Sequence, residues 1–358
     1  MNPKAAASIA ELDDHPVKDT AEARADRMLD ALAALPADEQ LEMGLDVDAL
    51  RTAPLSYRLP QLEVLWTRRQ EELKEVYEAM AKPGEVLGAR IDTLQDASAS
   101  QSEVEEALVY LEDVLSDIDM AKDFHAMGGF PVLTSMLQLN KPEATREKAA
   151  WAIGTTVRND LDSQLWVLQG GPHGEPSALV LLLENAVAAA GPTLRTKVVF
   201  ALASCLSNSP EVQLIFSLLR GESALSSMYT ADGTTPTLRT RILVLLSDLS
   251  QEAAQGSGQA LGAMAPLGLG EGSGEWCRRA HHAVGEASQP AALEKVLQVV
   301  RSFKNVCVKD FASLRTGELL QRLGEQYGGT GVGGASSIDE GYRQELHLAL
   351  HELASSLQ

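Results

Sequence analysis

The sequence is poor in aromatic residues and in basic charge. Aromatic residues make up 4% of the 358 positions, whereas 45% are hydrophobic, chiefly Ala and Leu. This composition provides a large core and favours helices over a sheet. Asp and Glu outnumber Lys and Arg by 50 to 30, which gives a formal net charge of −20. Because such a surface repels phosphate groups and anionic lipids, we expect neither a nucleic-acid partner nor a membrane partner.

Long hydrophobic runs and clustered cysteines are also missing. No stretch approaches the ~20 apolar residues that a membrane-spanning helix needs. The chain shows no apolar signal-peptide segment near its start, and its last residues, HELASSLQ, are not a lumenal retention signal. At face value this pattern indicates a cytosolic chain, although a chain trimmed of its signal would look the same. The three cysteines, Cys205, Cys277 and Cys307, are odd in number and widely spaced, so we expect packed free thiols.

One short string recurs almost unchanged. Residues 192–197 read PTLRTK and residues 236–241 read PTLRTR, 44 positions later. The flanking text aligns as well, and similar segments occur further up and down the chain. Aligning all of them gives a series of anchor residues: Glu106, Lys148, Lys197, Arg241 and Lys295. Spacings of 42 to 54 residues are typical of a helical solenoid of the armadillo or HEAT kind.

The text around each anchor predicts a unit of three helices. Gly128 and Gly129 end one helix and open a short second one, and a long helix then runs from Arg146 to about Arg158. The recurring hexamer is the start of this long helix, where we expect its Thr to supply the capping oxygen. The pattern GGxPxL…AAWAIG…GG is similar to an armadillo repeat. The predicted fold is therefore an all-α armadillo-repeat superhelical solenoid with an N-terminal helical extension.

We expect three regions along the chain. Residues 1–59 are acidic and partly flexible, with one helix at ADRMLDALAAL. Residues 60–100 hold the lead helices, the first of them amphipathic and starting with Pro60 in its first turn. Residues 101–358 form the repeats, with Gly-rich insertions near 253–274 and 328–337.

No catalytic motif stands out. The run GLGEGSG at 268–274 is not a dinucleotide-binding fingerprint and follows no predicted strand, so we interpret it as a linker. P-loop, CxxC and GxSxG motifs are missing. His347 and His351 lie one helical turn apart, a spacing that can hold zinc, but Leu348 occupies the place of the metalloprotease glutamate. A zinc hydrolase stays an alternative; the interpretation that we prefer has no active site, no metal and no cofactor.

A binding surface is the remaining candidate. In a stacked solenoid the long helices line the concave face, which is the usual binding face. Trp151 and Phe200 occupy equivalent positions there and are equally consistent with inter-repeat core and with exposed anchors. Helix capping explains the residues at the helix ends as well as binding does. The candidate partner-binding residues are Tyr110, Asp113, Asp117, Trp151, Thr155, Arg158, Asn159, Phe200, Ser204, Ser207, Asn208 and Asp248.

Residues 116–133, SDIDMAKDFHAMGGFPVL, resemble the first-repeat signature of the armadillo-type nucleotide exchange factors of 70-kDa heat-shock chaperones. Met120 stands where that family usually has Asn. The later segments GEWCRRAHHAV, ALEKVLQVV and IDEGYRQELHLALHEL are similar to the endoplasmic-reticulum branch, the exchange factor of the chaperone BiP. The matching residues of the first signature are Asp119, Ala121, Asp123, Phe124 and Gly129.

The resemblance implies a non-enzymatic, monomeric cochaperone. Its concave face would bind the ATPase domain of a BiP-like chaperone and promote ADP release. The implied compartment is the lumen of the endoplasmic reticulum, with a cytoplasmic location as the alternative. The other function that we keep is an armadillo adaptor for extended peptides, a class that needs a ladder of Trp and Asn, whereas Trp151 stands alone here.

Overall fold

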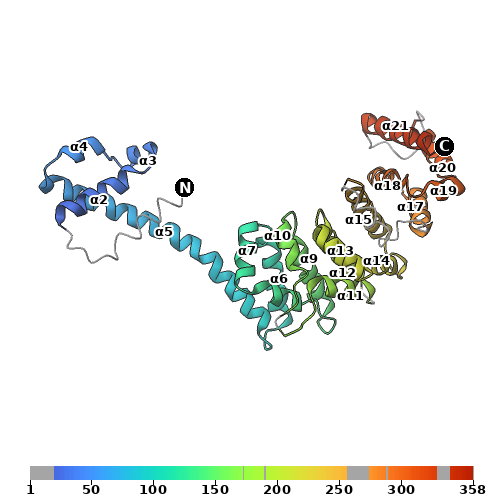
Figure 1. Cartoon of the computed structure of the whole chain (residues 1–358), viewed down its shortest axis with the longest axis horizontal. Helices are drawn as coiled ribbons and strands as arrows, with labels where there is room; N and C mark the ends of the chain where they lie inside the picture. The colour runs from blue at the N-terminus through green and yellow to red at the C-terminus, as the bar shows by residue number, and fades with distance from the viewer. Residues whose placement is uncertain are drawn as a thin grey trace. The chain divides into compact units, whose positions relative to one another are not determined.

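In the computed structural model, the described residues are 20–171, 173–188, 191–255, 274–287, 289–328 and 339–357. Within these ranges the chain forms helices and no strand, which confirms the all-α prediction. The chain divides into two compact units, Met1–Val86 and Leu87–Gln358, and the 41-residue helix α5 (Leu55–Gln95) belongs to both (Figure 1). None of the described helices is both long enough and apolar enough to cross a membrane.

The first unit contains α2 (Ala21–Ala33), α3 (Ala37–Glu42), α4 (Val47–Thr52) and the first part of α5. The α2 helix is the one that the sequence predicted, and the hydroxyl of Thr20 caps it. Leu29 on its apolar face lies in a small core with Leu50 of α4 and Leu62 of α5.

The start of α5 differs from the prediction. The helix begins at Leu55, and the carbonyl of Pro54 accepts hydrogen bonds from the N–H groups of Tyr57 and Arg58. Pro60 therefore lies in the second turn rather than at the helix start.

The second unit repeats a simple pattern in which short helices precede one longer helix. The longer helices are α6 (Gln101–Val114), α9 (Glu143–Thr156), α12 (Pro192–Leu206), α15 (Pro236–Gln255), α18 (Pro290–Phe303) and α21 (Glu340–Ser356). The shorter ones are α7 (Ile118–Ala126), α8 (Gly129–Ser135), α10 (Leu161–Trp166), α11 (Ala178–Val187), α13 (Pro210–Leu218), α14 (Gly221–Thr230), α17 (Gly274–Glu286), α19 (Val308–Ser313) and α20 (Thr316–Gly328).

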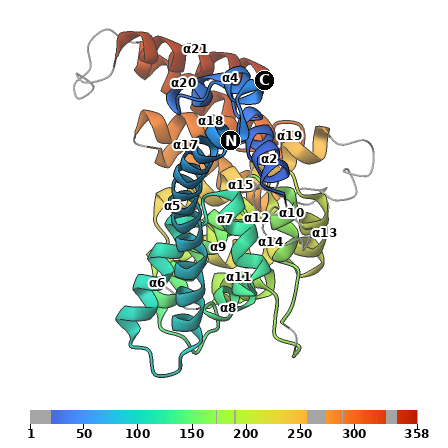
Figure 2. The same cartoon turned by 90° about the vertical axis from the view of Figure 1, so that its left-hand side faces the viewer.

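The long helices stack in chain order. Each of them contacts the next from α6 to α21, and from α9 onward the shorter helix before each long helix also packs on it (Figures 1 and 2). All five anchor residues of the sequence alignment lie on long helices, which confirms the repeat series. The sixth long helix, α21, carries His347 and His351, which were expected on a helix, but it lacks the recurring text and was not part of the anchor series.

The threonines of the recurring hexamer do not cap their helices. Gly191 is the N-cap of α12 and offers no side-chain oxygen, while Pro192 occupies the first turn. The hydroxyls of Thr196 and Thr240 donate instead to the carbonyls of Pro192 and Pro236, at 2.8 and 3.0 Å. Pro192 starts α12 through its fixed φ without a capping hydroxyl, whereas at α15 the hydroxyl of Thr235, which precedes the hexamer, accepts a hydrogen bond from the N–H of Leu238 at 3.2 Å.

The arginine of the first hexamer joins its helix to the next repeat. Arg195 is buried, and its Nη1 donates to the carbonyl of Asp232 at 2.8 Å and to the hydroxyl of Thr234 at 3.2 Å, in the loop that precedes α15. At the equivalent position of α9, Arg146 is buried and donates to Asn185 Oδ1 of α11 at 2.6 Å. Arg146 and Arg195 therefore link their long helices to the next repeat, whereas Arg239 of the second hexamer donates from Nε to the carbonyl of Tyr229 on the preceding helix α14 at 3.4 Å.

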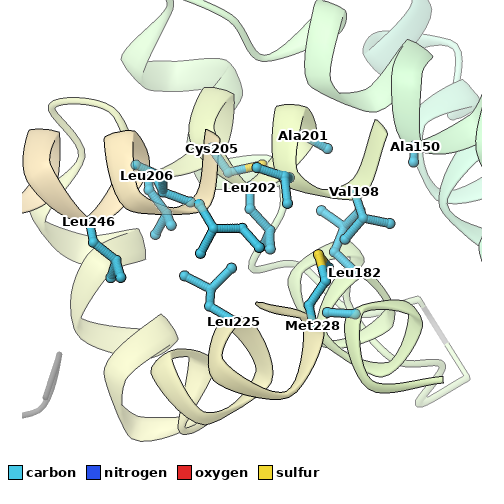
Figure 3. Close-up of a cluster of buried hydrophobic side chains, with 14 of the residues drawn as sticks. Ala150, Leu182, Val198, Ala201, Leu202, Cys205, Leu206, Leu225, Met228 and Leu246 are labelled. Carbon is cyan, nitrogen blue, oxygen red and sulfur yellow. The ribbon is translucent and has the colours of Figure 1, made fainter. Parts of the chain in front are cut away.

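Apolar side chains from successive repeats form one continuous core (Figure 3). Leu182 from α11, Leu202 from α12, Met228 from α14 and Leu246 from α15 are all fully buried. Cys205 lies among them, and its burial raises the pKa of the thiol to about 12, so this cysteine is a packed free thiol as expected.

The other two cysteines correct the prediction of free thiols. Cys277 near the start of α17 and Cys307 at the start of α19 form a disulfide, with their Cα atoms 5.6 Å apart. Their 30-residue separation gave no sign of this pairing, because α18 intervenes in the sequence while α17 and α19 pack against each other.

Candidate functional site

A groove of about 820 Å³ opens along the long helices of the second unit. Residues from α12, α15, α17 and α18 line it, together with Ala287 and Gln289 between the last two helices. Its apolar lining includes Val199, Phe200, Ala203, Val244 and Leu245. A groove of this volume can accept several side chains of a partner protein.

The charged lining of the groove is mixed. Arg239, Arg241 and Lys295 contribute positive charge, while Asp248 and Glu286 contribute negative charge. Partial desolvation, together with the nearby carboxylate of Glu252, raises the pKa of Asp248 above that of an ordinary aspartate.

The cations differ in how they are held. Arg239 lies over the ring of Tyr229, 5.7 Å from its centroid, whereas the exposed Arg241 and Lys295 form no ion pair with any described residue. These two cations therefore remain available to a partner.

Trp151 is the exposed aromatic residue of this surface. It is 37% exposed on α9, and the Nζ atom of Lys197 on α12 lies 3.0 Å from the centroid of its ring. Desolvation lowers the pKa of Lys197, while Glu112 and Glu147 oppose this shift. Of the two interpretations that the sequence left open, the structure therefore favours an exposed position for Trp151 over a core position.

Phe200 is both a packing residue and a groove residue. It is half-buried, and its ring lies so close to Gly154 of α9 that a Cβ atom at position 154 would be 2.7 Å from Phe200 Cε1. Gly154 therefore allows α9 and α12 to approach closely at this point. Phe200 also lines the groove.

Polar contacts join α6 to α9 beside Trp151. Lys148 pairs with Glu105 at 2.9 Å, and the hydrogen bond from Lys148 is the main cause of a lowered pKa for Glu105. The Thr155 hydroxyl donates to Glu112 Oε1 at 3.0 Å. Tyr110 lies under Arg90, whose guanidinium carbon is 5.0 Å from the ring centroid.

The predicted site residues at the helix ends have structural roles. Asp117 caps α7 by accepting hydrogen bonds from the backbone of Asp119 and Met120. Asn159 and Asn208 adopt left-handed φ angles of 62° and 54° just after α9 and α12, a conformation that Asn tolerates better than most residues. Asp117 is thus a helix cap, and the two asparagines accommodate the left-handed backbone after their helices.

The remaining predicted residues divide between surface and interior. Ser204 is buried, and its carbonyl, like that of Ser207, accepts a hydrogen bond from Gln164 Nε2. Asp113 and Arg158 are exposed.

The groove thus contains only two of the predicted residues, Phe200 and Asp248. Arg241, Lys295 and Glu286 were not predicted as site residues. Arg241 and Lys295 were already known as alignment anchors, so a recurring cation at one repeat position was the signal that could have identified them.

The histidine pair does not assemble a recognisable metal site. The rings of His347 and His351 are 4.5 Å apart, and His347 Nδ1 lies 2.8 Å from the carbonyl of Gly324. In the described parts of the chain, no group of three or more His, Cys, Asp or Glu side chains could hold a metal ion. The Gly-rich run at 268–274 lies outside the described residues except for Gly274.

Comparison with known proteins points to one family. Residues 120–266 match the family model described as the SIL1/FES1/HPBP1 C-terminal domain. The nucleotide exchange factor SIL1 of Mus musculus is 25% identical over 342 residues, which cover 92% of this chain and 70% of the relative. The protein of the same name from Rattus norvegicus is 26% identical over 222 residues, covering 62% of this chain and 45% of the relative.

Solved structures agree on the fold. The designed armadillo repeat protein YIII(Dq)4CqI superposes with a TM-score of 0.53 at 15% identity and covers 75% of this chain and 99% of its own. A computationally designed armadillo repeat protein for modular peptide recognition gives a TM-score of 0.54 at 14% identity, with the same coverage. These neighbours confirm the armadillo-like solenoid. In sequence this chain is therefore similar to the nucleotide exchange factors of the SIL1 branch, and in fold it is similar to armadillo repeat proteins.

Proposed function

We propose that this chain is a cochaperone that binds the ATPase domain of a BiP-like 70-kDa heat-shock chaperone and promotes the release of ADP. The observation that carries the proposal is the long-helix surface of the solenoid, which offers the exposed Trp151 beside an open groove. The alignment with a named nucleotide exchange factor over 92% of the chain supports the same function.

The mechanism needs no catalytic group from this protein. The groove and the neighbouring long helices would bind the chaperone better when its nucleotide cleft is open, whereas ADP binds better when the cleft is closed. Binding therefore shifts the population toward the open state, from which ADP dissociates faster. In this proposal the protein is not an enzyme and acts as a monomer.

We further propose that the protein works in the lumen of the endoplasmic reticulum. The SIL1 relatives suggest this compartment, and the buried disulfide between Cys277 and Cys307 supports it. Disulfides form and persist in oxidising compartments and are rare in the cytosol, where thiols are kept reduced.

The direct test is the rate at which a fluorescent ADP analogue leaves purified BiP and a cytosolic homologue. We expect the full chain to accelerate release from BiP, and to do so more strongly than from the cytosolic chaperone. Binding to BiP without any acceleration would contradict the proposal and favour the alternative of a peptide-binding adaptor.

A further inference from the structure

Four consecutive long helices carry a cation at the same repeat position. These residues are Lys148 on α9, Lys197 on α12, Arg241 on α15 and Lys295 on α18. The first two are engaged within the protein, because Lys148 pairs with Glu105 and Lys197 covers the ring of Trp151.

The last two cations of this series have no such partner. Arg241 and Lys295 are exposed, line the groove and form no hydrogen bond or ion pair with a described residue. The chain as a whole has a net charge of −20, so acidic side chains that could neutralise them are abundant elsewhere. Other exposed cations, such as Lys122 and Lys309, also form no ion pair with a described residue, so what distinguishes Arg241 and Lys295 is that they lie on contacting helices and line one groove.

The groove combines this charge with an apolar lining. Phe200, Val244 and Leu245 provide apolar surface, and Arg241 and Lys295 project from the two helices that form its centre. Arg recognises carboxylates through its planar guanidinium fork, and Lys acts as a point charge. A segment that alternates apolar and acidic side chains fits both features.

We propose that Arg241 and Lys295 bind carboxylates of an acidic segment on the partner protein, while the apolar lining accepts the neighbouring side chains. The inference rests on the proposed function for the identity of that partner, the ATPase domain of the chaperone. Asp248 and Glu286 lie in the same groove and oppose the attraction. Complementary charge of this kind selects the partner and accelerates association.

The test uses charge changes in both directions on the full chain. In one variant Arg241→Glu and Lys295→Glu are combined, and in a second Asp248→Asn removes an opposing charge. The matched control combines Lys122→Glu with Lys309→Glu, two exposed cations on α7 and α19 that do not line the groove. It makes the same change in net charge.

Two probes are titrated at 50 and 500 mM salt. The first is the BiP ATPase domain without nucleotide. The second is a labelled peptide of alternating Glu and Leu, compared with the same peptide carrying Gln for Glu. We expect the Arg241/Lys295 variant to bind both acidic probes roughly tenfold more weakly at low salt. The loss should shrink at high salt, where the Debye length falls to about 4 Å.

Asp248→Asn should bind the acidic probes about twofold more tightly, a gain that misfolding cannot produce.

If the Arg241/Lys295 variant binds as the control does, while the wild-type chain still accelerates ADP release, the inference is overturned and the proposed function stands. If the wild-type chain fails to bind the ATPase domain but distinguishes the Glu peptide from the Gln peptide through these two cations, the proposed function fails and the acidic-segment site stands.

Discussion

The tryptophans Trp151 and Trp276 lie in opposite environments, one exposed and one buried. Trp151 is 37% exposed under Lys197, whereas Trp276 is 2% exposed and donates from its indole nitrogen to Glu222 at 2.7 Å. We expect Trp151→Ala to weaken binding of the chaperone ATPase domain by about 2 kcal/mol, because exposed Trp residues dominate interfaces. Calorimetric titration measures this loss.

The matched change at Trp276 separates binding from folding. Trp276→Ala removes a buried ring and should lower the free energy of unfolding by about 3–5 kcal/mol. Trp151→Ala should lower it by less than about 1 kcal/mol, as measured by urea denaturation. Equal destabilisation by the two variants would show that Trp151 is a core residue.

At the scale of the element, the recurring hexamer can be dissected. Arg195 is buried and hydrogen-bonded to the next repeat, while Thr193 is exposed in the same hexamer and has no capping role. We expect Arg195→Met to lower the free energy of unfolding by about 2–3 kcal/mol, because it leaves Thr234 and a carbonyl without their charged donor. Thr193→Ala should change it by less than about 0.5 kcal/mol. The reverse order, measured by urea denaturation, would restore the capping explanation.

The disulfide between α17 and α19 is the second element-scale test. A disulfide that closes a loop of 30 residues reduces the conformational entropy of the unfolded chain, which raises the free energy of unfolding by about 3–4 kcal/mol. Replacing Cys277 and Cys307 together by Ala should therefore destabilise the second unit by that amount, which thermal denaturation measures. A reductant should lower the stability of the wild-type protein to that of the double variant. It should leave the stability of the double variant unchanged. If reductant destabilises both proteins equally, the bond is not the source of the stability.

For the whole molecule, the proposed mechanism requires reciprocal coupling. If binding of this protein weakens the chaperone's hold on nucleotide, then nucleotide must weaken the binding of this protein by the same factor. We expect saturating ADP or ATP to lower its affinity for the isolated ATPase domain about 5- to 150-fold in a calorimetric titration. Equal affinities with and without nucleotide would contradict exchange activity and leave a scaffold.

The helical repeats were predictable because their signals are local. Hydrophobic spacing, Pro at the first turn and the recurring PTLRT text each depend on neighbouring residues, and they located five of the six long helices. α21 was expected as a helix but was not aligned with the other long helices, because it lacks their recurring sequence. The start of α5 was placed too late because Pro60 was taken as a first-turn signal, and the helix accommodates it one turn later.

The candidate site was less predictable because it depends on which helix faces pack against each other. Phe200 and Asp248 were identified from alignment, but Arg241 and Lys295 become site residues only once α15 and α18 pack side by side. The roles of Asn159 and Asn208 likewise required their backbone angles. Alignment shows equivalent positions and does not show which of them already have partners.

The sequence by itself determined the helical class, the repeat and the acidic surface, because composition and periodicity act through short-range propensity and summed charge. Only the tertiary structure decided that Cys277 and Cys307 form a bond, that Trp151 is exposed, and that two of four equivalent cations are unpaired. Each of these facts depends on distances between residues that lie 30 or more positions apart in the chain, and such distances are set by how the repeats stack.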